Sequence, residues 1–232
     1  MTQKDSIWYF EDVDLYRIFC PHTVKEANKT QKHTFLKFKK NEFIYFEEDK
    51  SELVYLVSTG KVKVGRYLDD GRELTKAVLT KGEIFGEMAI MGEPERKDFA
   101  QALEDTTICP LTLAEMDDLM LENKNLSLKM RQLIGLRLRK AERMIASLLF
   151  KSSRQRIVEF LLDLADEYGQ KVGFETLVKE FFSHKIIAGL TATSRQTVTT
   201  VLNELKRKNI INFDRKRLLI RDLELLKKEV LE

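Results

Sequence analysis

Cysteine is scarce in this chain of 232 residues, and so are proline, tryptophan and histidine. The two cysteines, Cys20 and Cys109, lie far apart, which excludes a disulfide scaffold and a four-cysteine iron–sulfur cluster. No apolar run approaches the roughly 18 residues that cross a bilayer. The first residues also lack the basic-then-apolar order of a secretion signal. We therefore expect a cytoplasmic protein with no membrane-spanning segment.

Side chains that bind metals are equally few. Cys20, His22 and His33 could supply an axial ligand to haem, but no histidine lies in a predicted strand. A cupin-type metal enzyme has a related barrel, and it needs several histidines or carboxylates that converge from strands. The sequence lacks that pattern, so we expect no metal site and no catalytic residue, and the sequence itself requires no cofactor.

Charge is present in abundance but is distributed unevenly. Charged residues make up 33% of the chain, and the net charge of +3 conceals an asymmetry. Residues 1 to 128 hold 18 basic and 24 acidic side chains, residues 129 to 150 hold 6 and 1, and residues 151 to 232 hold 16 and 12. This distribution suits an acidic sensor domain that is joined to a part that meets polyanions.

The segment from Phe35 to Cys109 has the pattern of short strands and tight turns. Residues 61 to 64, "KVKV", alternate with period two, and "DDG" at 69 to 71 is a hairpin signal. Many short strands at even spacing predict an antiparallel sandwich or barrel. We expect residues 1–112 to form this domain.

Helical periodicity replaces the strand pattern from Thr112 to about Phe150. A short helix with Leu113, Met116 and Leu119 precedes a long one, in which apolar residues recur at steps of four and three. This seam is typical of one strand of a two-helix coiled coil, although it could instead pack on its own domain. The seam residues are Ile134, Leu138, Ala141, Ile145 and Leu148. We expect residues 113–151 to form a helical connector that includes a dimerisation helix.

The remaining residues, 152–232, predict a third domain. A helix should begin at Ser152 or Ser153, a candidate hinge, and end at Gly169. Helices are expected over 175–190 and 194–208, followed by two short strands about a basic turn in "NIINFDRKRLLIRD". Three helices and a hairpin in this order predict a winged helix-turn-helix.

The stretch "TATSRQTVTTVLNEL" at 191 to 205 predicts an amphipathic helix with one polar face. Val198, Val201, Leu202 and Leu205 share one stripe, and Ser194 can cap the helix. The first turn then carries an arginine and a glutamine, which can read guanine and adenine in a major groove. Thr197, Ser183 and His184 lie near helix starts and suit phosphate contacts. An ordinary amphipathic surface helix is the alternative.

Two stretches carry a resemblance to a known family. The segment "SHKIIAGLTATSRQTVTTVLNELKRKNII" resembles the helix-turn-helix of the cyclic-AMP receptor protein and fumarate-nitrate regulator (CRP/FNR) family, whose recognition helix opens with Ser-Arg-x-Thr-Val. The segment "LVYLVSTGKVKVGRYLDDGRELTKAVLTKGEIFGEMAIMGEPERKDFAQA" resembles the cyclic-nucleotide-binding domain of the same family. Together they span nearly the whole chain from about residue 30.

The resemblance implies an α+β protein with an N-terminal antiparallel β-roll, a long dimerisation helix and a C-terminal winged helix-turn-helix. It also implies that Arg195 reads a guanine, whereas Gln196 and Thr200 leave the base preference open. Ala192 stands where the family usually has glycine, which implies strain or a different turn. The candidate DNA-binding residues are Ser183, His184, Ser194, Arg195, Gln196, Thr197 and Thr200.

A candidate effector site follows from the Gly-Glu-x-Ala signature of the family. In nucleotide-binding members the glutamate contacts the ribose, and an arginine nine or ten residues later meets the cyclic phosphate. The matching positions here are Gly86, Glu87, Met88, Ala89, Arg96 and the adjacent Lys97. Asp98, however, could bring negative charge towards a phosphate. A cyclic nucleotide is therefore one candidate effector, and an internal Glu87–Arg96 ion pair in an empty or repurposed barrel is the alternative.

These patterns favour a homodimeric regulator that binds double-stranded DNA and senses an effector in its β-roll. RNA polymerase remains open as a further partner, and no membrane partner is expected. The alternative function is a ligand-binding regulatory module that acts through a protein partner contacted by the basic tail. The sequence does not separate activation from repression.

Overall fold

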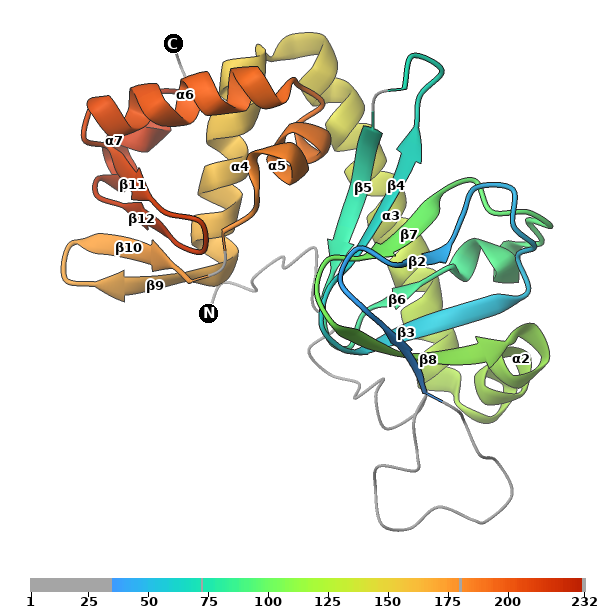
Figure 1. The fold of residues 1–232 in the computed structure, drawn as a ribbon. Helices are drawn as coiled ribbons and strands as arrows, with labels where there is room; N and C mark the ends of the chain where they lie inside the picture. The colour runs from blue at the N-terminus through green and yellow to red at the C-terminus, as the bar shows by residue number, and fades with distance from the viewer. Residues whose placement is uncertain (1–34, 72, 180, 231–232) are drawn as a thin grey trace. The chain divides into compact units, whose positions relative to one another are not determined.

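The computed structural model describes residues 35–71, 73–179 and 181–230 (Figure 1). The chain forms two compact units, which divide between Arg137 and Leu138. The division into three domains that we expect from the sequence remains a proposal.

The first unit contains two four-stranded antiparallel sheets, which confirms the predicted β-roll. One sheet has the strand order β1 (Leu36–Phe38), β8 (Thr106–Thr112), β3 (Leu53–Thr59) and β6 (Ile84–Phe85). The other has the order β2 (Phe43–Tyr45), β7 (Phe99–Ala102), β4 (Val62–Tyr67) and β5 (Glu73–Leu79). The predicted turn at Gly71 joins β4 to β5 with a φ of 77°.

The core of this unit follows from the alternation of side chains along the strands. Val62 and Val64 of β4 lie in one apolar cluster with Tyr45, Tyr55 and Phe85. A second cluster, packed around β3 and β8, includes residues from the helices that follow. Its buried members are Val54, Leu56, Ile84, Cys109, Leu111, Met116, Leu126 and Met130.

Two helices complete the first unit, and the second of them continues into the next unit. Helix α2 (Leu113–Glu122) begins with a capping box formed by Thr112 and Glu115. Helix α3 (Lys124–Phe150) is uninterrupted, as the periodicity predicts. Its first turns bury Leu126 and Met130. A short 3₁₀ helix, η2 (Glu87–Met91), follows β6.

The second unit is a helix-turn-helix domain with a small antiparallel sheet. Its strands follow the order β11 (Ile211–Phe213), β12 (Leu218–Ile220), β10 (Glu175–Val178) and β9 (Gly169–Val172). Its helices are α4 (Ser153–Tyr168), α5 (His184–Leu190), α6 (Arg195–Arg207) and α7 (Leu223–Lys228). A core drawn from all four helices and the sheet lies between them. The winged helix-turn-helix is confirmed.

The helix predicted over 175–190 is wrong in its first half. Residues Glu175–Val178 form strand β10, in which Thr176 and Val178 are buried while Leu177 is half-buried. The tight turn at Gly173, with a φ of 62°, directs the chain back along β9. Period-two burial therefore prevails over the helical pattern, and α5 begins only at His184, after Ser183 caps it.

The break between the two central helices lies where the sequence places it. Helix α3 ends at Phe150, and Ser152 caps α4 through a capping box with Gln155. A hinge at this break remains a proposal. In the part of the chain that the structure describes, no helix combines the length and apolar character needed to cross a membrane.

Candidate DNA-binding surface and effector cluster

Helix α6 has one buried face and one exposed face, as the sequence predicts. Val198, Val201, Leu202 and Leu205 are at most 5% exposed. On the other side Arg195, Gln196, Thr200, Asn203 and Arg207 are exposed. Three of these exposed residues, Arg195, Gln196 and Thr200, are in the predicted DNA-binding set. The polar face therefore lies open along the whole helix.

The turn before α6 is strained at one residue. Ala192 has a φ of 48°, in the left-handed region that glycine adopts without steric penalty. The Thr193 amide donates to the Ala188 carbonyl at 2.9 Å. Ser194 then caps α6, and its hydroxyl accepts from the Thr197 amide at 3.0 Å. The strain that alanine implies at this position is therefore present.

His184 connects α5 to the first turn of α6. Its Nδ1 lies 2.8 Å from the Thr199 hydroxyl, which itself donates to the Arg195 carbonyl at 2.9 Å. Since the hydroxyl hydrogen is used in that second bond, His184 Nδ1 is the donor to Thr199. Burial, and then the charge of Arg195, lower the pKa of His184. The neutral ring thus supports the start of α6.

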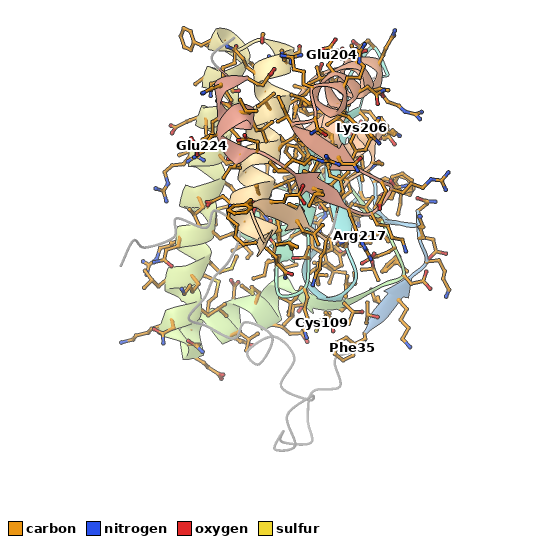
Figure 2. The ribbon with its side chains drawn as sticks, turned by 90° about the vertical axis from the view of Figure 1, so that its left-hand side faces the viewer. Phe35, Cys109, Glu204, Lys206, Arg217 and Glu224 are labelled. Carbon is orange, nitrogen blue, oxygen red and sulfur yellow. The ribbon has the colours of Figure 1, made fainter. Side chains whose placement is uncertain are left out.

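A basic turn between β11 and β12 was missing from the predicted DNA-binding residues. Asp214 Oδ1 accepts from the amides of Lys216, at 2.7 Å, and Arg217, at 2.9 Å. These bonds fix a tight turn whose side chains Arg215, Lys216 and Arg217 are exposed. Figure 2 labels Arg217 on this hairpin. The basic residues are visible in "DRKR", but the sequence alone does not show that Asp214 accepts from two amides of the turn.

Glu87 of the Gly-Glu-x-Ala signature is buried beside α3. It is 1% exposed, and its Oε1 accepts from the Arg137 guanidinium. The same guanidinium donates to the Ile84 carbonyl at 2.8 Å. Burial lowers the pKa of Arg137 to about 10, so it stays charged at neutral pH. Arg137 lies outside the Gly-Glu-x-Ala segment and is not among the effector residues that the sequence predicts.

Arg96 does not pair with Glu87, so the alternative interpretation, an internal ion pair between them, is wrong. Arg96 is 4% exposed and donates to the carbonyls of Gly86, at 3.0 Å, and Leu53, at 2.5 Å. Its guanidinium lies 4.5 Å from the ring centre of Tyr45. Backbone carbonyls and an aromatic ring thus hold this cation, because the carboxylate is already bound by Arg137.

Asp98 reaches a neighbouring tyrosine and is not left unpaired. It accepts from the Tyr45 hydroxyl at 3.2 Å and from Lys76 Nζ at 2.9 Å. Burial and the Asp98 charge raise the pKa of Tyr45, so the hydroxyl stays protonated and donates. Tyr45, Tyr55 and Phe85 stack on one another in the barrel interior.

Two buried polar atoms in this cluster have no hydrogen-bond partner. They are Glu87 Oε2 and Arg96 Nε. A ligand hydroxyl could donate to Glu87 Oε2, and Arg96 Nε could donate to a ligand acceptor, while the terminal nitrogens of Arg96 already donate to the Gly86 and Leu53 carbonyls. Ala89 is buried, but Met88 and Lys97 are exposed. The predicted effector residues are therefore only partly brought together.

The other predicted sites give a mixed result. Leu138, Ile145 and Leu148 of the seam are 61%, 58% and 46% exposed, and Ala141 is also exposed, while Ile134 is half-buried. The haem candidates Cys20, His22 and His33 fall outside the described residues. Among residues 35–71, 73–179 and 181–230, no group of three or more histidine, cysteine or acidic side chains could hold a metal ion.

Comparison with known proteins is decisive at this point. The cyclic nucleotide-binding domain family matches residues 35–123, and the Crp-like helix-turn-helix domain family matches residues 155–229. The cyclic AMP receptor protein of Thermus thermophilus is 32% identical over 183 residues, which cover 79% of this chain and 82% of that protein. The chain belongs to the CRP/FNR family of transcription regulators.

Other CRP/FNR proteins extend the match, and their names differ. The global nitrogen regulator of a Nostoc species is 29% identical over 185 residues, covering 79% of this chain and 83% of that protein. CooA from Carboxydothermus hydrogenoformans, in a mutant structure, has a TM-score of 0.80 and 29% identity, and the match covers 94% of this chain and 95% of CooA. CRP/FNR membership therefore establishes a DNA-binding transcription regulator and leaves the effector open.

Proposed function

We propose that the chain is a homodimeric, sequence-specific regulator that inserts α6 of each copy into the major groove. The observation that carries this proposal is the exposed face of α6, where Arg195 and Gln196 occupy the first turn while the opposite face is core. Arg195 would read guanine O6 and N7, and Gln196 would read adenine. Ser183, Ser194 and Thr197 would contact phosphates near helix starts.

The dimer proposal rests on α3. The exposed apolar residues of its second half continue beyond the seam to Leu149 and Phe150, which are 71% and 83% exposed. A second copy of the helix would cover them by knobs-into-holes packing. Two copies of α6 would then meet half-sites about one DNA turn apart, so the preferred site would be a palindrome.

The partners and location follow from this proposal. A DNA-bound regulator acts in the cytoplasm, where RNA polymerase is the natural protein partner. Phe174, fully exposed in the turn between β9 and β10, supports a contact with some protein. It is also the observation that favours the alternative function, a regulatory module that works through a protein partner without reading DNA.

The test of DNA reading starts from an operator selected out of random duplexes with the parent protein. Arg195→Ala should bind that operator more weakly, by about 1 to 3 kcal/mol of binding free energy, and should no longer discriminate between bases at one base pair. Arg66→Ala removes the same charge from an exposed site on β4 and serves as the control. Equal affinity of the parent and Arg195→Ala would contradict the assignment of α6. Absence of any selected site would favour the protein-partner function.

The effector is tested separately, and a cyclic nucleotide is the first candidate because Glu87 Oε2 lacks a partner. Calorimetric titration with cyclic AMP and cyclic GMP would be compared in the parent and in Glu87→Gln, which keeps the side-chain volume. Saturable binding that weakens in the variant would support a nucleotide site at this cluster. No binding would direct the search to other effectors, or to a regulator that works without one.

A further inference from the structure

Arg156, in the first turn of α4, binds acceptors that come from three parts of the second unit. Its Nη1 donates to the Lys151 carbonyl at 2.8 Å, just after the end of α3. Its Nε donates to the Thr191 carbonyl at 2.9 Å, and Nη2 donates to the Ala192 carbonyl at 3.1 Å and to Ser153 Oγ at 3.3 Å. One guanidinium thus joins the end of α3, the start of α4 and the turn before α6.

The chemistry of these acceptors explains why an arginine suits this position. Carbonyls at helix C-termini lack intrahelical donors and carry partial negative charge. A planar guanidinium can reach several of them at once, whereas a lysine ammonium is a compact point charge on a flexible stem. Arg156 satisfies carbonyls after two helices, α3 and α5, with a single side chain.

The bond to Ala192 has a further consequence because that residue holds the left-handed conformation with a φ of 48°. This conformation is unfavourable for any residue other than glycine. An alanine keeps it only when the surrounding structure holds the backbone in place. Arg156 holds the carbonyl of this residue. Two residues later Ser194 caps α6, so the direction of α6 depends on this turn.

We propose that Arg156 is a positioning residue that fixes recognition helix α6 relative to the C-terminal end of α3. The inference rests on the proposed DNA-binding function and on the α3 seam as dimer contact. In the dimer, the end of α3 belongs to the interface between copies. Arg156 would therefore set the distance between the two recognition helices and with it the half-site spacing that the protein accepts.

Arg154 provides a matched comparison on the same helix. It is also partly buried, and it pairs with Glu204 of α6 at 2.6 Å and with Glu229. The contacts described for it join α4 to α6 and to the residue after α7, and they do not include the end of α3 or the turn at Ala192. Arg154→Lys should therefore reduce stability without changing the spacing that is read.

The experiment uses the full chain and the selected operator. Fluorescence anisotropy would measure the DNA affinity of the parent, Arg156→Lys and Arg154→Lys. The duplexes would be the palindrome, palindromes with one or two base pairs added or removed at the centre, and one isolated half-site. Thermal unfolding of each protein would be recorded alongside. Ser153→Ala removes a single weak acceptor of Arg156 and is the milder second variant, should Arg156→Lys fail to fold.

Arg156→Lys should bind the isolated half-site within about twofold of the parent and the palindrome about tenfold more weakly, the loss expected for a charge-assisted bond. Its preference for the parental spacing should flatten, and Ser153→Ala should shift in the same direction by about twofold. Arg154→Lys should show the same preference for half-site spacing as the parent. An unchanged spacing preference in Arg156→Lys, or equal losses on half-site and palindrome, would overturn the proposal. A parent that selects no palindrome would refute the proposed function itself.

Discussion

At the scale of single residues, Gly86 shows how the effector cluster constrains the chain. Its φ of 73° lies in the left-handed region, and it caps η2. A Cβ at this position would meet Arg96 Nη1 at 2.7 Å and the Leu53 carbonyl oxygen at 3.1 Å. The family signature therefore needs glycine for its conformation and also for the close approach of Arg96.

Replacement of Gly86 by alanine should reveal both effects. The left-handed conformation alone should destabilise the fold by about 1 to 2 kcal/mol, and displacement of buried Arg96 should add about 1 to 3 kcal/mol. Gly92→Ala is the control, because Gly92 has a φ of 85° and nothing within 4 Å of an added Cβ. Urea unfolding would measure both variants, and equal losses would show that Arg96 adjusts freely.

The partner of Glu87 marks the limit of what the sequence could predict at this scale. The nine-residue spacing of Glu87 and Arg96 matches the nucleotide-binding motif, with an internal ion pair between them as the alternative. The bond to Arg137 joins positions 50 residues apart, and it depends on where α3 crosses the barrel. The spacing of residues along α3 does not show which part of the barrel the helix contacts. The sequence therefore does not predict the ion pair between Arg137 and Glu87.

At the scale of elements, predictability follows the strength of the local periodicity. The sequence predicts helix α6 with its cap and both faces, because the helical spacing of four apolar residues and the capping position of Ser194 indicate the same helix. The sequence predicts helix where strand β10 lies, because four residues, Glu175–Val178, are too few to establish a period. Its place in the sheet is decided by pairing with β9 and with β12, which lies 40 residues away.

The network that joins α4, α6 and the end of α7 should make this unit sensitive to acid. Burial would raise the pKa of Glu229, but hydrogen bonds from Lys208 and Arg154 outweigh it and lower that pKa below its usual range. The ionised carboxylate is therefore favoured in the folded state. Its contribution is complete above the unfolded pKa, near about 4.3, and is lost as pH falls through the folded pKa.

Glu229→Gln should lower the free energy of unfolding by about 1 to 2 kcal/mol at neutral pH, and the difference from the parent should shrink below about pH 4. Glu224→Gln is the control, because Glu224 is 76% exposed and its pair with Lys227 contributes little (Figure 2). Denaturant unfolding from pH 3 to 7 would measure both variants. A constant difference across this range would contradict the assigned network.

At the scale of the whole molecule, the exposed apolar seam of α3 supports the proposed contact between two copies. The side chains of Leu138 and Ile145 are more than half exposed. The neighbouring residues of the same helix include several arginines and lysines. Exposed aliphatic residues in a regular seam are typical of a contact between copies. The sequence predicted the seam, and the dimer itself remains a proposal.

Leu138→Glu should convert the proposed dimer to a monomer, because it places a charge in an apolar seam next to the same charge of the second copy. Sedimentation equilibrium would measure the association constant, with a loss of about 3 kcal/mol or more expected. Leu121→Glu makes the same change at a site on α2 that is 81% exposed and outside the seam. Dimers of equal strength in both variants would remove α3 from the interface.

The independent capping box at Ser152 has a consequence for how such proteins diversify. Every residue of the apolar cluster in the second unit comes from Ile157 or later, and α4 carries its own start signal. A genetic crossover at the codon for Ser152 would therefore transfer the complete apolar cluster together with α6. Recombination at this codon could give one sensor a new set of target genes in a single event.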